Sequence, residues 1–111
     1  MNIPYDSPLL DDVLQALANQ KRRAIIHDLS LHPDTVGQLS RRHELSLPAI
    51  HKHVRVLEDA ELIIRRKAGR TNFLALNAGT LDVLRNWVTQ YNTHWGNTQA
   101  TLENYISKMK E

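Results

Sequence analysis

Residues 35–76 read TVGQLSRRHELSLPAIHKHVRVLEDAELIIRRKAGRTNFLAL, and this stretch decides the fold of the chain. Its first half predicts two helices joined by a turn, the helix-turn-helix of residues 35–60, with the second helix over residues 47–60. Its second half, residues 62–76, has the character of two strands joined by a basic loop. A helix, a turn, a helix and a charged hairpin, in this order, are typical of small proteins that place one helix in the major groove of DNA.

The second helix of this pair has one apolar face and one polar face. Ser46 is a good N-cap because its hydroxyl can accept a backbone N–H of the first turn. Pro48 lies in that turn, where its missing N–H costs little. At about 100° per residue, the apolar residues form one stripe that must be buried. The stripe comprises Leu47, Ile50, Val54 and Leu57.

The opposite face of this helix is small at its start and cationic further along. Small residues let a backbone sit deep in a groove, and lysine and arginine reach phosphates and base edges. His53 flanks the buried stripe, so we expect it to be a packing residue. The predicted base-reading residues are Ser46, Pro48, Ala49, His51 and Lys52.

The first helix and the hairpin supply further candidates for DNA contact. Thr35 and Gln38 have the spacing of a capping box, which starts the first helix. In the hairpin, Gly69 supplies the positive φ that a tight loop needs. Four cations crowd the tip, more than an edge strand needs for protection against aggregation. The predicted phosphate-binding residues are Gln38, Arg41, Arg55, Arg65, Arg66, Lys67 and Arg70.

Two helices are predicted before this stretch, over residues 7–18 and 20–31. Ser7 and Asn19 are typical residues for the starts of these helices. Three cations open the second of them, which is the unfavourable end for positive charge in the helix dipole. They either form a solvated basic face, or support the fold through an ion pair, or contact phosphate. These cations are Lys21, Arg22 and Arg23.

The C-terminal part predicts a single helix over residues 80–110. Its apolar residues recur at alternating steps of three and four, which is a heptad seam. A helix of about 30 residues would be about 45 Å long, so part of the seam should meet a second copy of the chain. The alternative is that the seam packs within one chain, and Gly96 predicts a kink or a close crossing. The seam comprises Leu81, Leu84, Val88, Tyr91, Trp95, Thr98, Leu102, Tyr105 and Met109.

Composition places the chain among single-domain proteins with a modest core. It has 111 residues, a net charge of +2 and no cysteine, which excludes disulfides and thiolate metal sites. No stretch is typical of a signal peptide or a membrane-spanning helix, so we expect a cytoplasmic protein. Residues 41–72 carry eight lysines and arginines against four acids. This local excess is either a footprint for phosphate or a solvated face.

Three segments resemble the ArsR-type winged-helix repressors, in the order found in that family. LANQKRRAIIHDL, residues 17–29, is similar to the family's opening helix pair, and residues 35–63 are similar to its helix-turn-helix. RRKAGRTNFLAL, residues 65–76, is similar to its wing. The resemblance implies one winged-helix domain over residues 1–111. It implies a mainly α fold, α-α-α-α-β-β-α, with a small β-hairpin and a long C-terminal dimerisation helix.

The resemblance also implies a homodimeric transcriptional repressor, and we expect it to bind a pseudo-palindromic operator in double-stranded DNA. Its two copies would pair through the first and last helices, residues 7–18 and 80–110. The implied interface residues are Leu10, Val13, Leu14, Leu84, Trp87, Val88, Tyr91, Trp95 and Leu102.

The metal sites of the family are not reproduced in this sequence. Metal-sensing members carry a cysteine pair at the start of the third helix, where residues 35–37 of this chain have none. Other members bind zinc on the last helix, and Asp82 and His94 are only fragments of that ligand set. WVTQYNTHW, residues 87–95, is similar instead to a non-metal branch, some members of which are thought to be autorepressors. We therefore expect no metal and no cofactor.

Other function classes receive less support from the sequence. An enzyme is disfavoured because the chain has no phosphate-binding glycine loop, no nucleophile elbow and no metal constellation. A protein-binding adaptor or anti-repressor that has lost DNA affinity is the alternative, but the basic hairpin tip favours DNA. No motif identifies a small-molecule inducer. The aromatic residues of the C-terminal part form either the dimer core or a small-molecule pocket; they are Trp87, Tyr91, Trp95 and Tyr105.

Overall fold

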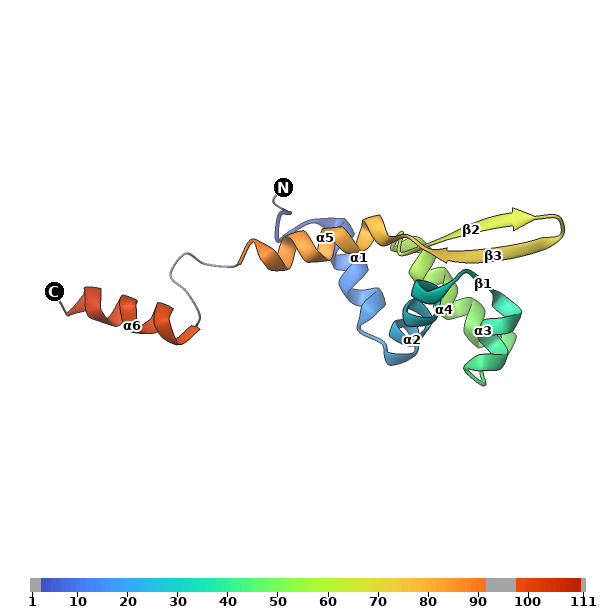
Figure 1. The fold of residues 1–111 in the computed structure, drawn as a ribbon, viewed down its shortest axis with the longest axis horizontal. Coiled ribbons are helices and arrows are strands. Elements are labelled where there is room, and N and C mark those ends of the chain that lie inside the picture. The colour runs from blue at the N-terminus through green and yellow to red at the C-terminus, as the bar shows by residue number, and fades with distance from the viewer. Residues whose placement is uncertain (1–2, 92–97, 111) are drawn as a thin grey trace.

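The computed structural model describes residues 3–91 and 98–110, and it is mainly helical with a small antiparallel sheet, as predicted (Figure 1). In chain order, the elements are α1 (Pro8–Leu17), α2 (Gln20–Leu31), β1 (Asp34–Thr35), α3 (Val36–Arg42), α4 (Leu47–Asp59), β2 (Ile63–Ala68), β3 (Thr71–Leu76), α5 (Ala78–Thr89) and α6 (Thr98–Met109).

Side-chain caps start helices α1 to α4 at the residues predicted from the sequence. Thr35 and Gln38 form the capping box: the Thr35 hydroxyl accepts the Gln38 amide at 3.1 Å, and the Gln38 side chain accepts the Thr35 amide at 3.0 Å. The Ser46 hydroxyl accepts the amide of Ala49 at 3.3 Å and so starts α4. Each cap satisfies a backbone N–H that has no partner inside its helix. The other two caps are Ser7 and Asn19.

The sheet contains a strand that the sequence analysis did not predict. β1, β3 and β2 are antiparallel and lie side by side in that order. β1 is two residues long, with Asp34 opposite Leu74 and Thr35 opposite Phe73. So short a strand has no pattern of its own, because it exists only through its pairing with β3. It ties the start of α3 to the hairpin.

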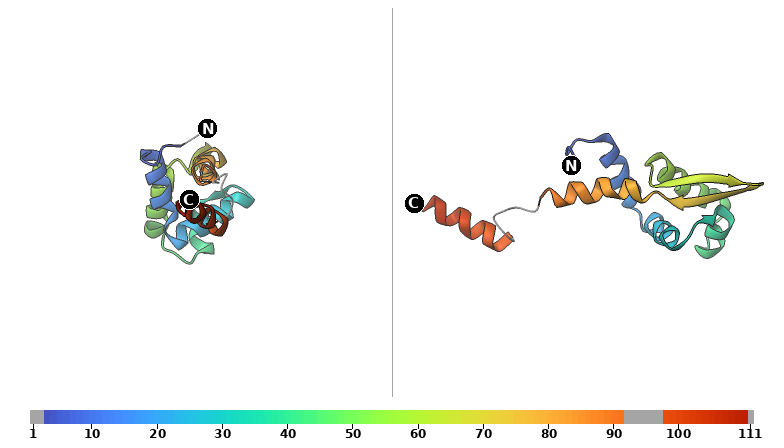
Figure 2. Two further views of the ribbon diagram at one scale, coloured as in Figure 1. Left: turned by 90° about the vertical axis from the view of Figure 1, so that its left-hand side faces the viewer. Right: turned by 45° about the horizontal axis from the view of Figure 1, so that its top comes forward.

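The β2–β3 hairpin projects beyond α3 and α4 (Figures 1 and 2). β2 continues to Ala68, so that Gly69 and Arg70 form the turn. Gly69 has a φ of +64°, as predicted. The positively charged tip therefore stands at the end of a regular two-stranded ribbon rather than in a loose loop.

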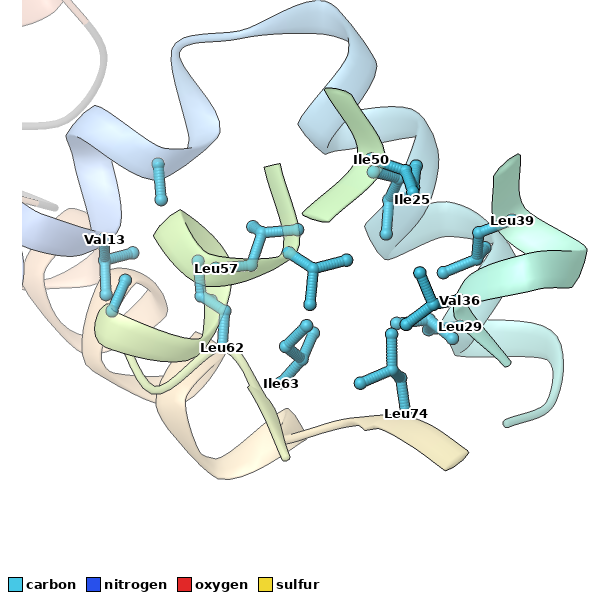
Figure 3. Packing of buried hydrophobic residues seen from close by; sticks show 13 residues of the cluster. Val13, Ile25, Leu29, Val36, Leu39, Ile50, Leu57, Leu62, Ile63 and Leu74 are labelled. Carbon is cyan, nitrogen blue, oxygen red and sulfur yellow. The ribbon is translucent and has the colours of Figure 1, made fainter. Parts of the chain in front are cut away.

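The core lies where α1 to α4 meet the sheet (Figure 3). Ile50, Val54 and Leu57 of α4 are completely buried, as predicted for the apolar stripe. The prediction for Leu47 is wrong, because this residue opens α4 beyond the reach of the core and is 52% exposed. The remaining buried residues of the cluster are Val13, Ala16, Ile25, Leu29, Val36, Leu39, Ala60, Leu62, Ile63 and Leu74.

The prediction of one continuous helix over residues 80–110 is wrong. α5 starts two residues early, with Asn77 as its N-cap residue, and ends at Thr89, while α6 is a separate helix. The expected kink at Gly96 falls outside the described residues. Neither α5 nor α6, nor any other helix in the described part of the chain, is long and apolar enough to cross a membrane.

Two of the cations at the start of α2 cap the end of α1. The Arg22 guanidinium donates from Nε to the Ala16 carbonyl at 2.6 Å and from Nη2 to the Gln15 carbonyl at 3.0 Å. Arg23 donates from Nη1 to the Leu17 carbonyl at 2.8 Å. The last carbonyls of a helix lack partners within it and carry partial negative charge. These arginines therefore support the fold by hydrogen bonding to backbone, which explains why positive charge is tolerated at the unfavourable end of α2.

Replacing Arg22 by alanine is expected to lower the free energy of unfolding by about 1.5–3 kcal/mol, because two charge-assisted hydrogen bonds are lost. Arg23→Ala is the matched control, because it removes one exposed bond from the neighbouring position. Urea unfolding followed by far-ultraviolet circular dichroism measures both. Arg23→Ala should cost less than Arg22→Ala, and a free energy of unfolding that Arg22→Ala leaves unchanged would contradict the capping role of Arg22.

Candidate nucleic-acid interface

The outward side of α4 and the root of the hairpin enclose a hollow of about 430 Å³. Pro48, His51, Lys52 and Arg55 line it from α4 and are exposed, and we call these four residues the recognition face. The hollow is polar and open to solvent. A helix face with two long cations beside a concave surface can take up phosphate and base edges.

Arg65 closes this hollow on the side of the hairpin through an ion pair with α4. Its Nη2 lies 2.9 Å from Glu58 Oε1 and its Nε lies 3.3 Å from Glu58 Oε2. The hydrogen bond to Glu58 raises the pKa of the Arg65 guanidinium. The pair sets the hairpin against α4, so Arg65, a predicted phosphate ligand, is already occupied by a carboxylate.

The three other hairpin cations remain available. Arg66, Lys67 and Arg70 are exposed and form no ion pair with any residue in the described ranges 3–91 and 98–110; we call them the wing cations. Arg66 and Lys67 lie in the last part of β2, and Arg70 lies in the turn that follows it. Their position fits a contact with the phosphate backbone on the flank of a bound groove.

The candidates on α3 differ in their availability. Arg41 is exposed near the end of the helix. The Gln38 side chain is held in the capping box by bonds to Thr35, so its oxygen is already an acceptor. Gln38 therefore positions α3, and Arg41 is the α3 residue that can reach a phosphate.

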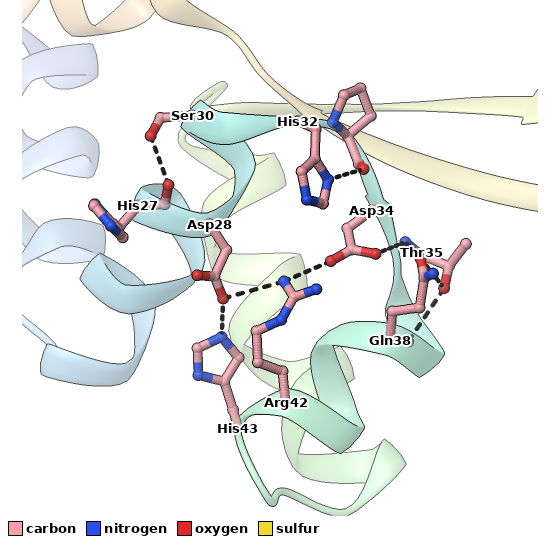
Figure 4. Close-up of polar contacts among 10 residues, drawn as sticks. His27, Asp28, Ser30, His32, Asp34, Thr35, Gln38, Arg42 and His43 are labelled. Atoms are coloured by element: carbon pink, nitrogen blue, oxygen red, sulfur yellow. Dashed lines mark hydrogen bonds and ion pairs between the residues drawn. The ribbon is translucent and has the colours of Figure 1, made fainter.

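A polar network that the sequence analysis missed holds α3 in place (Figure 4). Arg42 Nη1 lies 2.7 Å from Asp34 Oδ2 and 3.5 Å from Asp28 Oδ2, and His43 Nε2 lies 2.6 Å from the same Asp28 oxygen. Asp34 is almost fully buried, and its hydrogen bond raises the pKa of Arg42. The network joins α2, β1 and the end of α3. The favourable end-of-helix position of Arg42 was its only signal in the sequence.

His53 lies at the half-buried edge of α4. Burial lowers the pKa of its imidazole, and the positive charges of Arg22, Lys21 and Lys52 lower it further. A neutral ring at this place fits the packing role expected from the sequence.

Stability is expected to fall as the pH drops below about 6.5, the ordinary pKa of histidine, because the unfolded chain then takes up a proton more readily at His53 than the folded chain does. Above that pH, His53 makes no contribution to the pH dependence of the free energy of unfolding. His53→Gln should therefore flatten the profile of unfolding free energy between neutral and mildly acidic pH. The exposed His51→Gln is the control, and an unchanged profile in His53→Gln would count against this role.

Some of the residues implied for a dimer interface are buried within one chain, and others are exposed. Leu10 and Val13 are 1% and 0% exposed, so they hold α1 within its own chain. Leu84 packs at the edge of the same core. In contrast, Leu14 of α1 is 39% exposed. Further exposed apolar residues lie on α5, directly after it and on α6: Val88, Tyr91, Leu102, Tyr105, Ile106 and Met109.

Trp87 is half-buried and meets Tyr91 edge to face, with the ring centroids 5.5 Å apart. Trp95, also implied for the interface, lies outside the described residues. Among the described residues no three histidines, aspartates or glutamates could together hold a metal ion. Asp82 is instead within 3.4 Å of Arg85 in an ion pair.

Comparisons with known proteins agree with this geometry. The family model described as a helix-turn-helix domain matches residues 17–66. The HTH-type transcriptional regulator Rv2034 of Mycobacterium tuberculosis is 41% identical over 73% of this chain and 74% of its own length. The transcriptional repressor SdpR of Bacillus subtilis is 27% identical over 74% of this chain and 91% of its own length.

A solved structure extends the likeness from sequence to fold. The crystal structure of an ArsR family transcriptional regulator superposes with a TM-score of 0.71 at 31% identity, over 81% of this chain and 91% of that one. The order of elements, the exposed recognition face and the charged hairpin are thus accompanied by similarity in sequence and in fold. The chain belongs to the ArsR-type winged helix-turn-helix transcriptional regulators, which act by binding DNA and are not enzymes.

Proposed function

We propose that the protein is a homodimeric repressor that binds a pseudo-palindromic operator, with α4 of each copy in the major groove and each hairpin on the phosphate backbone. The observation that supports this best is the exposure of the recognition face and the wing cations on elements that are otherwise well packed. Long cations without carboxylate partners are ready to neutralise phosphate and release counterions.

The start of α4 carries the proposed sequence reading. Ser46, Pro48 and Ala49 form the first turn, which can approach the bases closely because its side chains are short. The Ser46 hydroxyl already accepts the Ala49 amide but can still donate to a base acceptor. His51 and Lys52 supply longer donors from the next turn.

The proposed phosphate ligands are fewer than the sequence predicted. Arg41, Arg55 and the wing cations are exposed and free to reach a backbone. Gln38 and Arg65 act indirectly, because their side chains hold α3 and the hairpin in position.

Replacing Lys52 by alanine is expected to relax sequence preference at one operator position by about 1–3 kcal/mol, because a base-edge contact is lost. Arg55→Ala is the comparison on the same face, and it should lower the affinity for all operator sequences alike. Binding to a library of operators with single base changes measures both. If Lys52→Ala kept the preference of the wild type at every position, α4 would dock differently.

Dimerisation is supported by the apolar surface that one copy leaves in water. Leu14 on α1, Val88 on α5, Tyr91 just after α5 and Leu102 on α6 are exposed. Burying such side chains is favourable by about 25 cal/mol per Å² of apolar surface. A two-fold axis through these helices would present the two α4 helices to successive major grooves, about 34 Å apart.

Repression requires only occupancy, because a dimer that covers a promoter excludes polymerase, and the relative SdpR is described as a repressor. Sedimentation equilibrium and DNase protection on a selected operator test the proposal together. The expected result is a mass of two chains and two protected half-sites about 10 base pairs apart. A single-chain mass with one protected half-site would contradict the dimer, and increased transcription from the occupied promoter would contradict repression.

A further inference from the structure

The β2–β3 hairpin has one face packed on the core and one open face. Ile63 and Leu74 point into the core and are buried. Ile64 pairs with Ala75 and Arg66 pairs with Phe73 across the two strands. Ile64 directly follows the buried Ile63, and Ala75 and Phe73 directly flank the buried Leu74. Neighbouring residues of a strand lie on opposite faces of a sheet. These two pairs therefore share the face that points away from the helices.

The open face contains a hollow of about 550 Å³ that shares only Arg66 with the proposed DNA contact. Short alanine side chains leave the hollow between longer neighbours. Ile64 is 47% exposed and Phe73 is 38% exposed, although both are apolar. The hollow, which we call the wing groove, is lined by Pro33, Ile64, Arg66, Ala68, Phe73 and Ala75.

The wing groove combines an apolar surface with one cation, Arg66. Its volume is in the range of small-ligand sites, roughly 300–1,000 Å³. Phe73 and Pro33 offer flat apolar surfaces for a ring, and aromatic pairs favour offset or edge contacts. A guanidinium pairs well with a carboxylate through two parallel hydrogen bonds. We propose that the wing groove binds a small planar apolar molecule that carries one carboxylate, with the rings on Phe73 and Pro33 and the carboxylate on Arg66.

Such a ligand would oppose DNA binding. Arg66 is one of the wing cations, and a guanidinium paired with a carboxylate is no longer available to a phosphate. The small carboxylate must then lower the affinity for DNA by the same factor by which DNA lowers the affinity for the carboxylate, because coupling between binding sites is reciprocal. This step rests on the proposed function, whereas binding of the ligand to the wing groove does not.

Amide chemical shifts of the ¹⁵N-labelled full chain, titrated with 2-naphthoate, test the groove itself. The expected result is saturable shifts centred on residues 64, 66, 73 and 75. The neutral 2-naphthol has the same rings without the carboxylate and should bind about tenfold or more weakly, because the charge-assisted pair is missing.

Variants locate the site. Phe73→Ser removes the aromatic wall, and Ala68→Trp fills the groove at an exposed position of the ribbon; both should abolish the shifts. Asn72→Ser is the matched control, because Asn72 lies on the opposite face of the same strand and should leave binding unchanged. Shifts centred on Trp87 and Tyr91 instead, or binding retained in Ala68→Trp, would overturn the proposal.

A DNA titration with and without saturating 2-naphthoate tests the coupling. The apparent affinity for DNA should fall about tenfold in the wild type and stay unchanged in Ala68→Trp. Undiminished DNA affinity at saturation would overturn the antagonism. Failure of the proposed function would look different, because DNA would then not bind even without naphthoate, while the shifts in the groove would persist.

Discussion

The double substitution Arg66→Ala/Arg70→Ala is expected to reduce affinity for every DNA sequence by about a thousandfold at about 0.15 M salt. Each phosphate contact contributes about 0.9 to the slope of log affinity against log salt, and a dimer would lose four such contacts. The loss is uniform because phosphates carry no sequence information. The slope should therefore decrease by about 3.6, and fluorescence anisotropy titrations over a range of salt concentrations measure it.

Asn72→Ser is a suitable control for the wing variant, because it changes an exposed uncharged residue on the same hairpin. It should leave both the affinity and the salt slope unchanged. Circular dichroism establishes that both variants are folded. A double variant that kept the salt slope of the wild type would show that the wing cations do not contact phosphate.

Leu57→Ala is expected to reduce the free energy of unfolding by roughly 2–5 kcal/mol, the largest stability effect that we predict. The Leu57 side chain has no exposed surface and lies at the centre of the contact between α4, α1 and the sheet (Figure 3). Its truncation leaves a cavity that the surrounding helices cannot fill. Domains of this kind have a total stability of about 5–15 kcal/mol, so the loss should be plain in urea unfolding.

The same substitution ten residues earlier provides the control. Leu47→Ala changes the first residue of α4, whose side chain is half exposed. Surface substitutions typically change stability by about 0.5 kcal/mol or less. Equal costs for Leu57→Ala and Leu47→Ala would mean that α4 packs with a different face inward.

The starts of α1 to α4 were predictable because their signals are local. A hydroxyl or amide side chain caps a backbone N–H three residues away, and this geometry needs no knowledge of the rest of the fold. Ser7, Asn19, Thr35 and Ser46 all follow this rule. The turn at Gly69 was predictable for the same reason, since a positive φ favours glycine.

Features that depend on distant partners were not predictable. β1 exists because Asp34 pairs with Leu74, forty residues later. The bond between Asp28 and His43 spans two helices. The exposure of Leu47 is likewise set by where α4 meets the core, which helical periodicity alone does not contain.

The candidate DNA-binding surface was predictable in outline only. The polar face of α4 follows from its apolar stripe, so Lys52 and Arg55 could be placed on the outside from periodicity. The pairing of Arg65 with Glu58 could not, because these residues belong to different elements and their contact depends on how the hairpin lies against α4. Charge counts in a sequence therefore overestimate the cations that are free to bind phosphate.

The most direct test of sequence-specific DNA binding is a pair of anisotropy titrations, on an operator selected from random DNA and on a scrambled duplex of the same composition. At about 0.15 M salt, the wild-type protein should bind the operator at least about a thousandfold more tightly than the scrambled duplex. The double variant Arg66→Ala/Arg70→Ala should lower the affinity for both duplexes by the same factor. Lys52→Ala should reduce the ratio between the affinities for the operator and the scrambled duplex. Equal affinity of the wild-type protein for the two duplexes would contradict recognition of a DNA sequence by α4.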